Sequence, residues 1–136
     1  MAVDLEQLLS TYGVDFVSVE DGFLATKIGS GQEGDPEFPL GLFVWQAGDG
    51  REYVRLIVSP FVERPEDGYP AVLSDTVLLL NDDVPRAKFI LDENEELALV
   101  LDLDAVETDS RSFGRALELL GAYSNHFYPR LASLVG

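Results

Sequence analysis

The residue best suited to acid–base chemistry is the single histidine. His126 is the only histidine among the 136 residues. Helical periodicity places it on the polar face of the last expected helix, opposite Phe113 and Leu120. A catalytic base or nucleophile needs a neighbouring group that orients or activates it. The sequence offers no such partner to His126, so we expect no catalytic residue there.

A second group with possible chemistry is the acidic run 92–96, Asp-Glu-Asn-Glu-Glu. Carboxylate oxygens are the ligands that Ca²⁺ prefers. The run lacks the spacing of a calcium-binding loop, and Asp102 with Asp104 fails at the positions that should follow. We therefore predict a solvated hairpin turn, with no metal and no cofactor. Neutralising Asp92 and Glu93 should then leave stability within ~0.5 kcal/mol of the parent.

The glycine-rich segment 29–34 could be taken for a phosphate-binding loop. Such a loop needs a helix N-terminus and usually a cation, as in the motif that ends in Gly-Lys-Ser/Thr. Here Asp35 and Pro36 follow instead. Acidic side chains repel phosphate, so we interpret residues 29–39 as a loop without a ligand.

Gly41, Phe43 and Trp45 alternate along one expected strand and therefore share one face. Exposed aromatic residues on a strand can stack on the bases of a single-stranded nucleic acid. A basic groove must accompany such a platform, and no cluster of Lys and Arg provides one. We favour packing of these side chains in the core.

The charge of the chain is strongly negative. Twenty-five Asp and Glu stand against nine Lys and Arg, which gives a formal net charge of −16. Direct binding to nucleic acid is disfavoured, because that affinity depends on Lys and Arg that neutralise phosphates. The negative charge can serve solubility, or it can attract a basic protein and speed their encounter.

Composition predicts one globular domain over residues 1–136. A hydrophobic content of 46% suffices for a core. No apolar run approaches the ~18 residues of a membrane span, and the first residues lack the pattern of a secretory signal. Without cysteine there are no disulfides. We expect a cytoplasmic protein.

Hydrophobic periodicity predicts three helices and three hairpins. The helices are expected over residues 4–12, 71–82 and from 109 or 110 to 134. The hairpins are expected over 16–28, with Asp21-Gly22 as its turn, over 40–59 and over 87–103. This order predicts an α+β fold, with an antiparallel sheet of about five to six strands and three helices packed on it.

Three finer predictions concern the helices and the core. Pro129 should kink the last helix or divide it in two, because proline removes a backbone donor. The helix over 71–82 should bury a broad face of Val72, Leu73, Thr76, Val77, Leu79 and Leu80. Phe89 and Leu99 should be buried beneath the last helix, beside Leu120 and Phe127.

Two leucines are candidates for an interface. Leu78 and Leu119 are apolar residues on helix faces that are otherwise polar. Leucines exposed singly are common on protein surfaces. On two helices of a protein that self-associates, however, they would be contact residues.

The C-terminal half carries a pattern of small groups of residues. They are Leu79-Leu80-Asn81, Ala87-Lys88-Phe89, the run 97–103, the stretch 113–120 and Tyr128-Pro129-Arg130-Leu131. This pattern resembles the YbjN family of small bacterial proteins. The element order resembles the type III secretion chaperone fold of that family, helix–β–β–β–helix–β–β–helix, with the first strand replaced by the hairpin at Asp21-Gly22. The resemblance covers residues 78–134 by pattern and the first half by order alone, and the loop 29–39 does not align.

The resemblance implies a non-enzymatic, chaperone-like or regulatory module that acts as a homodimer on a protein client. It maps no catalytic residue onto this chain. Given the charge, a basic, nucleic-acid-binding protein is the first client to consider. Two alternatives stay open, an acidic mimic of nucleic acid and a metal-dependent hydrolase. A charge map would identify the first, and a metal assay would identify the second.

Overall fold

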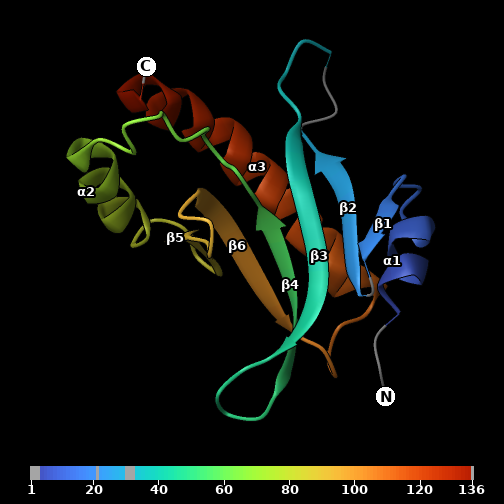
Figure 1. The fold of residues 1–136 in the computed structure, drawn as a ribbon. Helices are drawn as coiled ribbons and strands as arrows, with labels where there is room; N and C mark the ends of the chain where they lie inside the picture. The colour runs from blue at the N-terminus through green and yellow to red at the C-terminus, as the bar shows by residue number, and fades with distance from the viewer. Residues whose placement is uncertain (1–3, 21, 30–32, 136) are drawn as a thin grey trace.

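One six-stranded antiparallel sheet organises the chain (Figure 1). The computed structural model describes residues 4–20, 22–29 and 33–135. Along the sheet the strands follow the order β1-β2-β3-β4-β6-β5. The elements are α1 Leu5–Thr11, β1 Val17–Glu20, β2 Phe23–Ile28, β3 Phe38–Gln46, β4 Glu52–Val58, α2 Ala71–Leu80, β5 Ala87–Leu91, β6 Leu97–Asp104 and α3 Ser110–Val135.

These elements confirm the predicted α+β class, with three helices and six strands in the described residues. The strand β4 pairs with β6 and not with β5, the next strand along the chain, and the order of elements in the sequence does not show this pairing. The strand β5 lies outside β6, so it forms one edge of the sheet, and β1 forms the other.

The short helix α1 begins where its sequence predicts. The backbone N–H of Gln7 donates to Asp4 Oδ1 at 3.1 Å, so Asp4 caps the helix. Leu5, Leu8 and Leu9 are buried. Asp21, in the predicted turn of the first hairpin, lies outside the described residues.

The long helix α3 covers one face of the sheet (Figure 1). Phe89 and Leu99 are paired across β5 and β6, and both are buried in the core with Leu120 and Phe127. The ring of Phe89 meets Phe127 edge-on, with centroids 6.1 Å apart. The predicted register of this hairpin beneath the helix is therefore confirmed.

Of the kink or division expected at Pro129, the division does not occur. The helix runs without interruption from Ser110 to Val135. Phe127 and Leu131 are buried on either side of Pro129, while Pro129 itself is exposed. Burial of this apolar stripe holds the helix together across the one hydrogen bond that proline cannot make.

The opposite face of the sheet has no described helix over it (Figure 1). Gly41, Phe43 and Trp45 project on this uncovered face. The prediction that they pack in the core is therefore wrong, because Phe43 and Trp45 are only half-buried and stand outside the core cluster. Alternation along a strand assigns its residues to two faces of the sheet. It does not tell which of the two faces α3 covers.

Candidate protein-binding surface

An apolar row crosses the uncovered face of the sheet at right angles to the strands. The paired positions are Val17 with Ala25, Ala25 with Gly41, Gly41 with Ile57, and Ile57 with Val100. Residues paired directly across strands point to the same face. Five neighbouring strands therefore place apolar or small residues in one line, which ends at Lys88 on β5.

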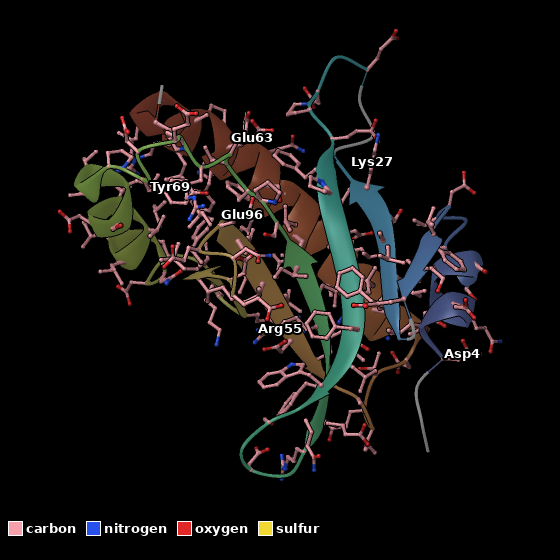
Figure 2. The ribbon with its side chains drawn as sticks, in the orientation of Figure 1. Asp4, Lys27, Arg55, Glu63, Tyr69 and Glu96 are labelled. Atoms are coloured by element: carbon pink, nitrogen blue, oxygen red, sulfur yellow. The ribbon has the colours of Figure 1, made fainter. Side chains whose placement is uncertain are left out.

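The middle of this row is hollowed into an open trough of about 570 Å³. Ala25 and Ile57 form its floor on either side of Gly41, and the rings of Phe23 and Phe43 also line it. The other side is formed by Ile90 and the turn between β5 and β6. Figure 2 labels two of the lining residues, Arg55 on β4 and Glu96 next to that turn. We call this feature the open-face trough.

The absence of a side chain at Gly41 shapes the trough. The rings of Phe23 and Phe43 stack with centroids 5.6 Å apart. A Cβ at position 41 would stand 2.6 Å from Cζ of Phe23. Glycine therefore allows the Phe23 ring to lean across β3, in the way that an aromatic ring covers a strand glycine.

The arginine that lines the trough is neutralised by its neighbours. Arg55 makes two hydrogen bonds of 2.9 Å to the carboxylate of Asp102. The Trp45 indole N–H also donates to Asp102, and the Arg55 guanidinium lies 4.5 Å from the Trp45 ring centroid. The arginine and aspartate side chains are 17% and 22% exposed. This cluster fixes Trp45 on the face without giving the trough a free positive charge.

The turn between β5 and β6 is built around Asp92. Its carboxylate accepts hydrogen bonds from the Ser59 hydroxyl at 2.7 Å and from the backbone N–H groups of Asn94 and Glu96. The prediction of an acidic hairpin turn is correct. The expectation that neutralising Asp92 leaves the stability unchanged does not fit this geometry, because three hydrogen-bond donors depend on its carboxylate.

These contacts give the turn a pH dependence. Burial alone would raise the pKa of Asp92, but the Ser59 hydroxyl and the backbone donors outweigh burial and hold the pKa below 3.8. A carboxylate with a lowered folded pKa stabilises the fold above its unfolded pKa and loses that effect as pH falls through the folded value. The stability advantage of the wild type over Asp92→Asn should therefore shrink as pH falls below about 3.8.

Urea unfolding from about pH 6 to about pH 3 measures this difference. Glu93→Gln is the control, because it removes one negative charge from the same turn. A difference between wild type and Asp92→Asn that stays constant over the whole range would contradict the assigned role of Asp92.

The second apolar surface lies on α2. Leu78 is 71% exposed, as its polar helix face predicts. Leu79 is 74% exposed and Val72 is half-exposed, so the prediction that these two belong to a buried face is wrong. The helix packs mainly against α3 and the edge strand β5, and Leu73 and Leu80 are its buried residues.

Leu119 differs from the expectation. It is half-buried and packs against the core cluster. The face of α3 that packs on the core includes partly buried residues beside Phe113 and Leu120, and Leu119 is one of them. The structure therefore leaves Leu78 exposed and gives Leu119 a packing role.

The histidine and the acidic residues that were considered for catalysis or metal binding do not come together in one site. His126 is exposed on α3, and its ring and that of Phe127 are nearly perpendicular, with centroids 4.7 Å apart. Within residues 4–20, 22–29 and 33–135, no three acidic or histidine side chains are placed to hold a metal ion. No helix in the same ranges is long and apolar enough to cross a membrane.

Sequence reasoning missed the open-face trough and the contacts that shape it. One indication was available, since both alternating sets of residues in β6 are apolar. Ala98 and Val100 are buried although they lie outside the core cluster. A strand with two apolar faces is expected where both faces of the sheet are covered. Here Ala98 and Val100 belong to the sheet face that carries the trough.

No family model and no curated protein matches this chain. Its fold is similar to that of several solved structures, among them the following two. One is a chain of the heterodimeric complex ExoU-SpcU from the type III secretion system of Pseudomonas aeruginosa, with a TM-score of 0.56 and 14% identity. The match covers 97% of this chain and 98% of that chain.

The second structure is a chain of the HopA1-SchA chaperone-effector complex. Its TM-score is 0.53 at 18% identity, over 95% of this chain and 90% of that chain. At these identities the likeness concerns the fold. The element order, the antiparallel sheet and the coverage together show that this chain has a type III secretion chaperone-like fold.

Proposed function

We propose that this protein is a non-enzymatic, chaperone-like or regulatory module that binds a protein client. The observation that carries the proposal is the open-face trough, an apolar surface that the fold leaves uncovered. Contiguous apolar surface exposed on a protein commonly marks an interaction site. The likeness to a chain of a chaperone-effector complex supports a protein as the occupant.

The chemistry of the trough supports binding over catalysis. Its lining side chains are mostly apolar or acidic, and its one cation, Arg55, is held by Asp102. The lining also contains the neutral polar residues Thr26, Ser59 and Asn94, and the Ser59 hydroxyl donates to Asp92 within the turn. A catalytic site brings together a nucleophile or base, its orienting partner and a stabilising donor. The trough lacks that arrangement among its lining residues, and His126 lies on α3 rather than in the trough.

The charge supports a basic client, including a nucleic-acid-binding protein. At a net charge of −16 the chain attracts positively charged partners over a long range and speeds their encounter. We further propose that residues 1–136 form one domain that acts in the cytoplasm. Its residue pattern over 78–134 supports a relationship to the YbjN family.

We propose that the protein works as a homodimer through α2. Leu78, Leu79 and Val72 present an exposed apolar surface on this helix. A stable interface buries about 800 Å² per partner, which one helix and the adjoining sheet edge at β5 can supply.

Self-association should tighten as salt concentration rises. Two chains of charge −16 repel each other, and salt screens charges that lie more than about 8 Å apart at physiological ionic strength. Sedimentation equilibrium across a salt series measures the effect. A complex held by attraction to a basic client should weaken over the same series.

Leu78→Glu should dissociate the dimer, because it places a charge in the apolar contact. Val106→Glu is the matched control, since Val106 is exposed on the loop that follows β6. A protein that stays monomeric at about tens of micromolar at every salt concentration would contradict the dimer, while client binding by one chain would stand.

Client binding is tested by capture from the native cytosol. The purified protein is immobilised, the bound proteins are identified by mass spectrometry, and an unrelated protein of similar size and charge serves as the control. We expect a small set of basic proteins that the control does not retain. Capture of the same proteins by this chain and by the control would contradict a specific client.

A further inference from the structure

We infer that the open-face trough receives an apolar segment of a partner protein that is flanked by Lys or Arg. This inference rests on the proposed function and assigns it a place and a chemistry. The occupant is a short stretch of polypeptide, with apolar side chains in the trough and a basic side chain at the acidic turn between β5 and β6.

The apolar part follows from the row across the sheet. Val17, at the free edge of the sheet, is 67% exposed and begins the line that continues through Ala25, Gly41 and Ile57. The surface that a segment could cover is therefore longer than the trough itself. Its burial is favourable by roughly 25 cal/mol per Å² of apolar area before the cost of ordering the segment is subtracted.

The depth of the trough favours side chains over a flat contact. Ala25 bears the smallest side chain that the row leaves open, because the Phe23 ring already covers Gly41. A large apolar side chain fits over Ala25 and against the Phe23 ring, which stacks on Phe43. Anchors of this kind contribute most of the binding energy in protein interfaces.

The basic part follows from the rim. Asp92, Glu93 and Glu96 line the side of the trough that the turn between β5 and β6 forms. In the described part of the chain, neither Glu93 nor Glu96 forms an ion pair, and the one arginine in the lining is bound to Asp102. The rim therefore carries negative charge that the protein does not neutralise, and Lys or Arg of a partner complements it.

The same charge argues against a second copy of this chain in the trough. A copy carries the same charge of −16 and would bring further carboxylates towards the rim. A small apolar molecule would leave much of itself in water, because the trough is open and its apolar row continues to the sheet edge at β1. Ligand sites usually enclose 70–90% of a small molecule.

The inference is tested with a phage-displayed library of random peptides, about 15 residues long, selected on the immobilised full chain. Selected peptides should combine an apolar core with Lys or Arg at one or both flanks. Each is then synthesised with a fluorophore, and its Kd is measured by fluorescence anisotropy. The absence of selected peptides, or peptides with acidic flanks, would overturn the inference.

Paired variants locate the site. Ala25→Leu fills the trough floor and should weaken peptide binding by about tenfold or more. Ala122→Leu makes the same change on the exposed side of α3 and should bind as the wild type does. Ile57→Thr is a second floor variant, which decides the outcome if Ala25→Leu does not fold, as judged by circular dichroism.

The basic flank is tested with two charge-reversal variants, Glu93→Lys and Glu118→Lys, which change the net charge equally. Only Glu93 lines the trough. Reversal at Glu93 should weaken binding several-fold more than reversal at Glu118. Equal losses in the two variants would reduce the effect to overall charge and would overturn the basic-flank assignment.

The outcomes separate this inference from the proposed function. If proteins captured from the cytosol bind Ala25→Leu and Ile57→Thr as tightly as wild type, the client site lies elsewhere and only the trough assignment fails. If Ala25→Leu weakens self-association and leaves peptide binding unchanged, a second copy occupies the trough and the inference is wrong. If no specific client is captured at all, the proposed function and the trough assignment both fail.

Discussion

Replacing Phe89 with alanine should lower the free energy of unfolding by about 3–5 kcal/mol. Phe89 is 4% exposed, and its ring lies edge-on to Phe61 at 5.2 Å and to Phe127 at 6.1 Å. Truncation removes the transfer energy of the ring and leaves a cavity beneath α3. A loss of this size is a large part of the stability of a domain of 136 residues.

Urea unfolding followed by circular dichroism measures this loss. The control is Leu91→Ala, which lies on the same strand, β5, and is 59% exposed. Its effect should stay within about 1 kcal/mol. A Phe89→Ala variant as stable as the parent would refute the assigned register of β5 against β6.

Replacing Asn81 with alanine should cost about 2–3 kcal/mol, although no ring or ion pair is lost. The Phe89 backbone N–H donates to Asn81 Oδ1 at 2.6 Å, and Asn81 Nδ2 donates to the Phe89 carbonyl at 3.1 Å. One side chain therefore pairs with both backbone groups of an edge strand, as a neighbouring strand would. Alanine leaves both groups without a protein partner in a half-buried place.

Asn94→Ala is the matched control for this change. Asn94 is an exposed residue of the turn after β5, and its backbone N–H, not its side chain, donates to Asp92. The control should stay within about 0.5 kcal/mol of the wild type. Thermal unfolding of both variants compares them, and equal melting temperatures would contradict the role given to Asn81.

Local features of the fold could be predicted because they depend on neighbouring residues. Asp4 and Gln7 lie at the spacing of a helix cap, and Gly22 has the positive φ that the first turn requires. The burial of Phe89 and Leu99 followed from alternation along two strands joined by a short turn. In these cases the physical cause lies within a few residues of its effect.

Features that depend on the order of the strands could not be predicted. The pairing of β4 with β6 aligns Ile57 with Val100 and completes the apolar row, and nothing in the sequence around Ile57 indicates it. Trp45 and Phe43 were assigned to the core because the sequence does not tell which sheet face α3 covers. Asn81 falls near the end of the helix predicted over 71–82, but its bonds to Phe89 arise only in the folded chain.

The exposed leucines of α2 show a third limit. Periodicity places Val72 and Leu79 on one face with Leu73 and Leu80, and this pattern is typical of a buried face. Burial also requires a surface to pack against. In the described structure α2 packs mainly against α3 and β5, and Leu79 stays exposed. This is the surface to which we assign self-association.

The central claim is that this chain binds a protein client without changing it chemically. Isothermal titration of a purified captured client into the full-length wild-type chain tests the claim most directly, with the intact mass of the client measured before and after. We predict saturable binding at a fixed stoichiometry and an unchanged client mass. The absence of saturable heat for every captured protein, or a client whose mass has changed, would contradict the account.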